Sequence, residues 1–270
     1  GNLLTHRVIY NPYLHTSLHY LTLVDALLSD RQITPLPKFS VPPVELSPPR
    51  YDVPGQDTAS VAKLLDELLP RREKLVLLNP NASDMLPLRR WDGENFIDLA
   101  KRLVARDGVS VAMTGGKFER AAVEAMAERV GSDRCVSVAG RTSLRELFAL
   151  YNQADALVTN DSGPGHFASL TPIKAVVLFG PETPLLYGPL GDNVHVVWSG
   201  LACSPCVSAL NHRFSPCDDN VCMQSIDVGH VEQVVLDLLA GTTPGDRPLR
   251  SPVPTVSLPV MSTRPDVATR

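Results

Sequence analysis

The sequence predicts an α/β fold in which helices cover a parallel β-sheet, and three observations support this prediction. From residue 74 onward, short apolar runs alternate with segments of helical periodicity, which is typical of repeated βα units. Polar turns that contain glycine follow several of these runs, as expected where a parallel strand leads into a helix. Hydrophobic residues make up 44% of the 270 residues and charged residues 20%, a balance that allows a buried core and excludes disorder throughout.

Before residue 74, the pattern predicts two helices joined by a proline-rich linker. Apolar residues recur at helical spacing over residues 10–28. Seven prolines between positions 35 and 54 favour an extended chain, and we expect a domain boundary there. Asp57 or Thr58 is expected to cap the next helix, which continues to residue 69.

From residue 74 to 241, the pattern predicts one domain of six strands with helices between them. A serine and a glutamate with capping-box spacing open the helix at 143–153, and Gly241 ends the last helix. The strands are expected at 75–78, 109–114, 135–138, 156–159, 175–179 and 194–197, and the helices at 94–106, 118–130, 143–153, from 164, and at 230–240. Residues 242–270 contain six prolines and no period, and we expect a disordered tail.

Charge and hydropathy narrow the class of partner. The formal net charge of -4 and the pI near 6.0 exclude a general polyanion binder, so we expect no nucleic-acid partner and only a local phosphate site. No apolar run is long enough to span a bilayer, and residues 1–20 do not resemble a signal peptide. The sequence thus predicts a cytoplasmic protein, with at most peripheral association at the inner face of the cytoplasmic membrane.

The loop after the strand at 156–159 is the first candidate ligand site. It contains Asp161, Ser162, Gly163, Pro164, Gly165 and His166 and leads directly into a helix. Ligands of open parallel sheets bind beyond the carboxyl ends of the strands, and the free N–H groups of a helix start favour a diphosphate. Ser162 and His166 add side-chain donors, and Gly163 and Gly165 permit close approach of the backbone. The alternative is a capped turn that binds no ligand.

Three other loops contribute candidates for the same ligand. Ser83 and Arg89 follow the first strand, and arginine can bind phosphate oxygens in pairs. Glu119 follows a Gly-Gly turn and can accept hydrogen bonds from ribose hydroxyls, or can instead stabilise a helix start. Neither the P-loop spacing nor G-x-G-x-x-G occurs. Glu182 and Thr183 follow the fifth strand and can meet the ribose or a sugar, although the flanking prolines also explain them as a turn.

Four cysteines form a separate cluster in the sequence. Cys203, Cys206, Cys217 and Cys222 have the spacing C-x2-C-x10-C-x4-C, which can hold a tetrahedral metal ion. The alternative is a structural loop with reduced thiols, because the spacing departs from common metal ribbons. We predict no metal and no firm cofactor.

An ordered set of motifs resembles glycosyltransferase family 9, the heptosyltransferase-like family, over residues 74–241. The motifs are NPNA at 79–82, RRW at 89–91, TGG at 114–116, GRTSL at 140–144, DSGPGHFA at 161–168, FGPETP at 179–184 and YGPLG at 187–191. The resemblance implies a GT-B architecture of two Rossmann-like domains, with residues 74–241 as the nucleotide-sugar-binding domain. Residues 1–73 would then be the end of an acceptor-side first domain, most of which this chain lacks, and the linker.

The resemblance also implies a reaction. Family members transfer heptose with inversion, typically from ADP-heptose to a lipopolysaccharide-core sugar, and the same donor and a lipopolysaccharide-core or other glycan acceptor are expected here. It places Asp161, Ser162, Gly163 and His166 around the diphosphate and sugar, and Arg89 near the phosphates.

The catalytic base is the part of the family pattern that the chain does not match. In relatives it is an aspartate in a Gly-Asp segment near the start of the first domain, and no such segment occurs here. One alternative is therefore a catalytically silent module that binds a nucleotide-sugar. Another is a sugar-nucleotide epimerase, which would consume donor without an acceptor.

Overall fold

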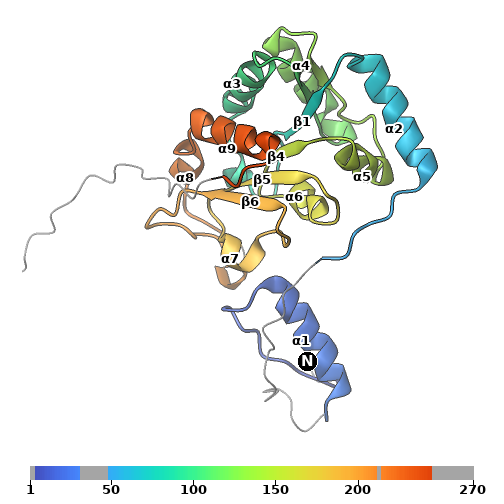
Figure 1. Cartoon of the computed structure of the whole chain (residues 1–270). Helices are drawn as coiled ribbons and strands as arrows, with labels where there is room; N and C mark the ends of the chain where they lie inside the picture. Colours follow the sequence, from blue (N-terminus) through green and yellow to red (C-terminus); the bar gives the residue numbers. More distant parts are fainter. Residues whose placement is uncertain (1–3, 31–47, 212–213, 245–270) are drawn as a thin grey trace, which may run out of the picture.

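The computed structural model describes residues 4–30, 48–211 and 214–244. Within them, six parallel strands form one sheet in the order β3-β2-β1-β4-β5-β6, which confirms the predicted α/β fold (Figure 1). Each predicted strand overlaps an observed one. The strands are β1 (Lys74–Asn79), β2 (Val109–Met113), β3 (Cys135–Ser137), β4 (Ala156–Asn160), β5 (Lys174–Phe179) and β6 (Val194–Trp198).

Helices cover both faces of the sheet, and each face has its own hydrophobic core. In β1, Val76 and Leu78 face one core, whereas Leu75 and Leu77 face the other, because successive side chains of a strand point to opposite sides. Burial on both faces explains why the strands are continuous apolar runs. The first core is covered by α3 (Gly93–Val104), α4 (Arg120–Val130) and α9 (Val228–Ala240), and the second by α2 (Gly55–Leu68), α5 (Leu144–Asn152) and α6 (Gly163–Ala168).

Helix ends agree with the sequence in two cases and differ in a third. The capping box at Ser143 is present, and Gly241 ends α9 with a left-handed φ of 76°. The predicted cap of α2 was wrong. This helix begins at Gly55 with Pro54 as its N-cap residue, so Asp57 and Thr58 lie in its first turn.

The first helix, α1 (Thr16–Leu28), is shorter than the predicted segment 10–28. A turn precedes it, in which the backbone N–H of Tyr13 donates to Asn11 Oδ1 at 3.0 Å. Proline at position 12 disfavours a helical conformation at Asn11, which accounts for the later start. His15 then caps α1, because its Nδ1 accepts from the N–H of Ser17 at 3.2 Å.

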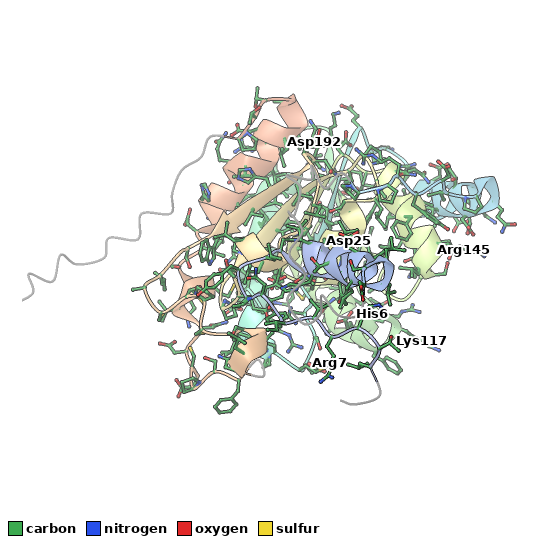
Figure 2. The ribbon with its side chains drawn as sticks, turned by 90° about the horizontal axis from the view of Figure 1, so that it is seen from below. His6, Arg7, Asp25, Lys117, Arg145 and Asp192 are labelled. Atoms are coloured by element: carbon green, nitrogen blue, oxygen red, sulfur yellow. The ribbon has the colours of Figure 1, made fainter. Side chains whose placement is uncertain are left out.

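Helix α1 lies outside the three layers and contacts the short helix α7 (Pro184–Tyr187) (Figures 1 and 2). His15 Nε2 donates to the carbonyl of Gly188 at 3.0 Å, and Thr16 Oγ1 donates to the carbonyl of Leu186 at 3.1 Å. The remaining elements are η1 (Pro87–Arg89), η2 (Lys117–Glu119), η3 (Ala209–Asn211) and α8 (Val221–Gln224).

Three predictions for the chain as a whole have different outcomes. Most of the proline-rich linker, at 31–47, and most of the tail, at 245–270, lie outside the described residues. The domain boundaries therefore stay predictions. No helix in the described ranges combines the length and apolarity needed to cross a membrane.

The strand order fixes where a ligand can enter. The chain builds β1, β2 and β3 toward one edge of the sheet and then returns to place β4 on the other side of β1. In such a sheet the connections after β1 and β4 diverge, and this leaves a crevice at the carboxyl ends of these two strands.

Candidate functional site

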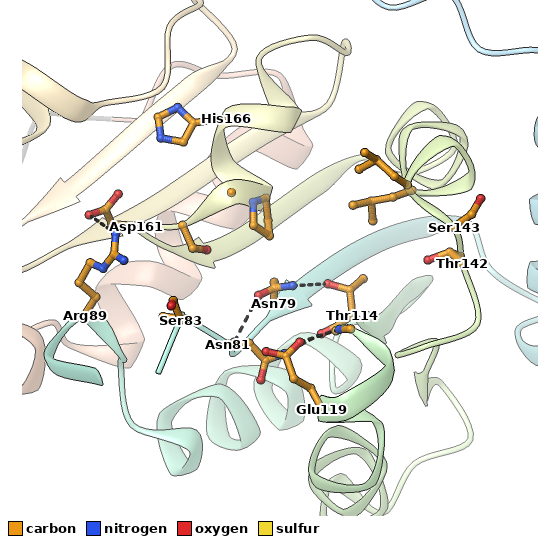
Figure 3. Close-up of a pocket in the computed structure, with 18 residues that line it drawn as sticks. Asn79, Asn81, Ser83, Arg89, Thr114, Glu119, Thr142, Ser143, Asp161 and His166 are labelled. Carbon is orange, nitrogen blue, oxygen red and sulfur yellow. Dashed lines mark hydrogen bonds and ion pairs between the residues drawn. The ribbon is translucent and has the colours of Figure 1, made fainter. Parts of the chain in front are cut away.

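A cavity of about 420 Å³ lies at this crevice (Figure 3). Its walls come from the loops after β1, β2, β3 and β4, although these loops are far apart in the sequence. In Figure 3, Asp161 and His166 lie at one end of the cavity, and Thr142 and Ser143 lie at the other. The lining residues are Asn79, Asn81, Ala82, Ser83, Arg89, Thr114, Gly115, Gly116, Glu119, Thr142, Ser143, Leu144, Leu147, Asp161, Ser162, Gly163, Pro164 and His166.

The floor of the cavity is a network of side-chain amides that the sequence did not predict. Asn79 Nδ2 donates to Thr114 Oγ1 at 3.0 Å and thereby joins the ends of β1 and β2. Asn81 Nδ2 donates to the carbonyl of Thr114 at 3.3 Å. Asn160 Nδ2 donates to the carbonyl of Pro80 at 3.0 Å, which joins the end of β4 to the loop after β1. These bonds hold three loops in fixed positions, and only the motifs NPNA and TGG pointed to them in the sequence.

A buried ion cluster forms the wall beside Asp161. Arg89 Nη1 lies 3.6 Å from Asp161 Oδ2 and 3.5 Å from Glu182 Oε2. The Arg89 side chain is 13% exposed, and the two carboxylates are 4% and 3% exposed. One cation is thus shared by two acids from the loops after β4 and β5.

Burial controls the charge of this cluster. It raises the pKa of Asp161 to about 7, an effect that the Arg89 cation opposes and the nearby Glu182 carboxylate strengthens. Near neutral pH, Asp161 therefore exists in both its charged and its neutral forms. The neutral form reduces the negative charge at the wall that faces the start of α6.

The start of α6 presents backbone donors to the cavity. Within the described chain, no group accepts a hydrogen bond from the backbone N–H of Ser162 or Gly163. The Ser162 hydroxyl does not cap the helix and donates instead to the carbonyl of Asn160 at 3.1 Å. A Cβ added at Gly163 would come no closer than 3.6 Å to Phe167, so the backbone here is open toward the cavity.

Three predicted residues lie near the cavity without lining it. Gly165 is buried, and a Cβ there would lie 3.1 Å from Val177 Cγ2, so its small size serves packing on β5 and not approach to a ligand. Glu182 reaches the site only through Arg89. Thr183 caps α7, since its Oγ1 accepts from the N–H of Leu185 at 3.3 Å.

The other predicted residues line the cavity with different degrees of freedom. Ser83 Oγ accepts from the N–H of Met85 at 3.2 Å and keeps its own proton available. Glu119 Oε2 accepts from the N–H of Gly116 at 2.6 Å, which is the helix-start role, and its carboxylate still borders the cavity. The ring of His166 makes no hydrogen bond within the described residues. Burial lowers the pKa of His166, and His15 and Arg89 add to this shift, which favours the neutral ring.

The cysteine loop does not form a metal cage. Cys203 and Cys217 are exposed and Cys222 is buried, and burial raises the pKa of Cys222 to about 11. Cys206 Sγ accepts a hydrogen bond from the hydroxyl of Ser215 at 3.3 Å. Among the residues described, no three histidines, cysteines or acids are grouped so that they could hold a metal ion.

Sequence comparison relates the chain to known enzymes. The profile of glycosyltransferase family 9 (heptosyltransferase) matches residues 43–213. Lipooligosaccharide heptosyltransferase 2 of Haemophilus influenzae is 27% identical over 165 residues, which are 60% of this chain and 47% of the relative. Lipopolysaccharide heptosyltransferase 2 of Salmonella typhimurium is 31% identical over 114 residues, which are 41% of this chain and 32% of the relative. The chain thus spans less than half of either relative.

Comparison of structures supports the fold. The ADP-heptose lipopolysaccharide heptosyltransferase II of Escherichia coli superposes with a TM-score of 0.63 at 22% identity, over 87% of this chain and 65% of that one. A family 9 glycosyltransferase of Veillonella parvula gives a TM-score of 0.64 at 19% identity, over 85% of this chain and 61% of that one.

Proposed function

Because the chain belongs to glycosyltransferase family 9, the heptosyltransferase family, we propose that its cavity binds a nucleotide-diphosphate sugar, ADP-heptose or a close analogue. We further propose that the protein transfers the heptose to a lipopolysaccharide-core or other glycan acceptor. The observation that carries the proposal is the open start of α6, at the carboxyl end of β4 and in the wall of the cavity.

The diphosphate is assigned to the start of α6. The free N–H groups of Ser162 and Gly163 are donors for phosphate oxygens, and the helix dipole adds to their effect. Arg89 supplies a cation beside them, and protonation of Asp161 reduces the repulsion that a buried carboxylate would otherwise exert on the phosphates.

The nucleoside is assigned to the opposite end of the cavity. Leu144 and Leu147 offer apolar surface for a base, and the carboxylate of Glu119 can accept hydrogen bonds from ribose hydroxyls. Gly115 is tightly enclosed, because an added Cβ would lie 2.8 Å from Asn81 Nδ2. A larger residue there would push Asn81 away from the floor of the cavity.

In the transfer step, the acceptor hydroxyl attacks the anomeric carbon from the face opposite the diphosphate. The bond to the diphosphate breaks with its electron pair, and the charge that develops on the leaving oxygen is stabilised by the N–H groups of α6 and by Arg89. The base that removes the hydroxyl proton is the part for which this chain offers no match to the family pattern.

Calorimetric titration tests donor binding. We expect ADP and ADP-heptose to bind, and UDP and GDP sugars to bind much more weakly. Incubation of donor with a delipidated lipopolysaccharide-core acceptor then tests transfer. Binding without transfer would favour the silent module, consumption of donor without acceptor would favour the epimerase, and failure of every nucleotide to bind would overturn the proposal.

A further inference from the structure

A second cavity lies beside the donor cavity and shares His166 with it. It has a volume of about 300 Å³ and is enclosed by the start of α1, the end of α6 and α7. His15 and Tyr20 come from the α1 side, Ser169 from α6 and Tyr187 from α7. We call this space the α1–α6–α7 pocket.

We propose that the α1–α6–α7 pocket is the subsite for the acceptor sugar, and that it places a sugar hydroxyl against His166. This assignment rests on the proposed function, because it takes the diphosphate to lie at the start of α6. Four features of the pocket support it, and they concern its position, a buried hydroxyl, its charge and its aromatic wall.

The position of the pocket suits an attacking hydroxyl. His166 follows Gly163 by three residues, so the two lie on the same face of α6, separated by about 4.5 Å along the helix axis. A hydroxyl that enters from the α1 side and reaches His166 is therefore close to a diphosphate bound at Gly163. The neutral ring that burial favours can accept a hydrogen bond from this hydroxyl.

A buried hydroxyl at the wall of the pocket has no partner. Ser169 is 4% exposed, and its Oγ makes no hydrogen bond to any residue that the structure describes. Buried polar atoms are nearly always paired, so an orphan at a cavity wall indicates a site where a ligand or water supplies the missing bond. A sugar hydroxyl supplies such a bond as donor or acceptor.

The charge of the pocket distinguishes an acceptor sugar from a phosphate. Of the described residues that line it, none is an acid, a lysine or an arginine, whereas the donor cavity contains Arg89, Asp161 and Glu119. An uncharged ligand with many hydroxyls fits these surroundings better than an anion does. It also fits better than a lipid tail, which would leave the hydroxyl of Ser169 unpaired.

Aromatic side chains supply the remaining wall. Tyr20 and Tyr187 line the pocket from opposite elements, and rings of this kind offer apolar surface together with a polar tip. His15 is held by both of its ring nitrogens, through Ser17 and Gly188, so the α1 side of the pocket has a defined shape.

The test measures oligosaccharide and nucleotide binding separately. Saturation-transfer difference NMR with a delipidated lipopolysaccharide-core oligosaccharide, in the presence of ADP, reports the first, and calorimetry with ADP reports the second. We expect Ser169→Ala to weaken oligosaccharide binding by roughly three- to tenfold, the usual effect of one hydrogen bond, and to leave ADP affinity within about twofold of wild type.

Two further variants make the result specific. Ser199→Ala removes another buried hydroxyl that has no partner among the described residues but lies outside the pocket, so it should change neither affinity. Ser17→Trp should fill the pocket from α1 and abolish oligosaccharide binding while ADP still binds. Thermal melts of each variant confirm that it is folded.

Three outcomes would overturn the assignment. If ADP binds but the oligosaccharide does not, or if Ser169→Ala and Ser17→Trp leave its binding unchanged, the pocket is not the acceptor subsite, although the donor site stands. If ADP-heptose displaces the oligosaccharide where ADP does not, the pocket holds the sugar of the donor. If ADP itself fails to bind, the proposed function fails first.

Discussion

Two helix starts border the same cavity, and they differ in how their backbone donors are used. At α5, Ser143 Oγ accepts from the N–H of Glu146 at 3.3 Å, and Glu146 Oε2 accepts from the N–H of Ser143 at 2.8 Å. At α6, Ser162 occupies the same position, but the third helical residue is Gly165, which has no side chain to complete the box. The first helix start is closed by its own side chains, and the second is open.

The comparison teaches that a serine at a helix start does not by itself indicate a ligand site. What distinguishes the two is the residue three positions later, together with the direction of the serine hydroxyl. Ser143 points its hydroxyl at its own helix, whereas Ser162 donates back to Asn160. The open start also has a buried cation beside it, Arg89.

The largest expected effect follows from removing that cation. Arg89→Gln leaves Asp161 and Glu182 buried without the positive charge they share, so we expect the free energy of unfolding at pH 8 to fall by about 3 kcal/mol. The loss should be much smaller at pH 5, because the pKa of Asp161 is about 7 and this carboxyl is then neutral. Urea denaturation at the two pH values measures both.

The matched control is Arg120→Gln. Arg120 pairs with Glu124 on the surface of α4, with side chains 46% and 35% exposed, and its replacement should cost less than about 0.5 kcal/mol at either pH. Equal losses for Arg89→Gln at pH 5 and pH 8 would indicate lost packing and not unpaired charge.

The second prediction closes the open helix start. Gly163→Asp places a carboxylate where the diphosphate is proposed to bind, so ADP affinity should fall about 100-fold, which corresponds to about 2.7 kcal/mol. Gly163→Ala is the control, because its Cβ meets only Phe167, at an ordinary contact distance of 3.6 Å. Titration calorimetry measures both. If alanine is as harmful as aspartate, space and not charge decides the effect.

The fold could be predicted further than the site. Parallel strands buried on both faces leave an unmistakable apolar run, and all six were found from this signal. Helix starts were less certain, since Asp57 can stabilise a first turn without being the cap. The start of α1 was missed because Pro12 overrides an apolar period that continues through it.

For the site, the loops could be predicted but not the contacts between them. The rule for carboxyl strand ends placed the cavity at the loops after β1, β2 and β4. The sharing of Arg89 by Asp161 and Glu182 depends on three loops that meet only in the folded chain. Gly165 was interpreted as an approach point for a ligand, but Val177 packs against it. Which lining residues contact a donor stays a prediction.

The third prediction concerns how pH changes the stability of the open wall. The folded pKa of Asp161 is raised from 3.8 to about 7, so between these pH values the folded state holds more protons than the unfolded state. Stability from this group is present below pH 4 and is lost as the pH rises toward 7. Asp161→Asn removes the titration, so the variant should gain stability relative to wild type over this range, by an amount of the order of 2 kcal/mol.

Denaturation curves at several pH values measure this difference. Asp84→Asn serves as the control, because the Asp84 side chain is 97% exposed and its replacement should give a difference that does not vary with pH. A difference for Asp161→Asn that stays constant from pH 4 to pH 8 would contradict the raised pKa.

The smallest effect is expected at the closed helix start. Glu146→Ala breaks the capping box of α5 and should lower the free energy of unfolding by about 1 kcal/mol, while ADP affinity stays within about twofold of wild type. Because the two side chains cap reciprocally, the loss in the double variant Ser143→Ala, Glu146→Ala should be less than the sum of the single losses. Urea denaturation measures the first effect and calorimetry the second. A large change in ADP affinity would mean that α5 also binds the nucleotide through its backbone, and the contrast between the two helix starts would no longer explain which of them holds the phosphates.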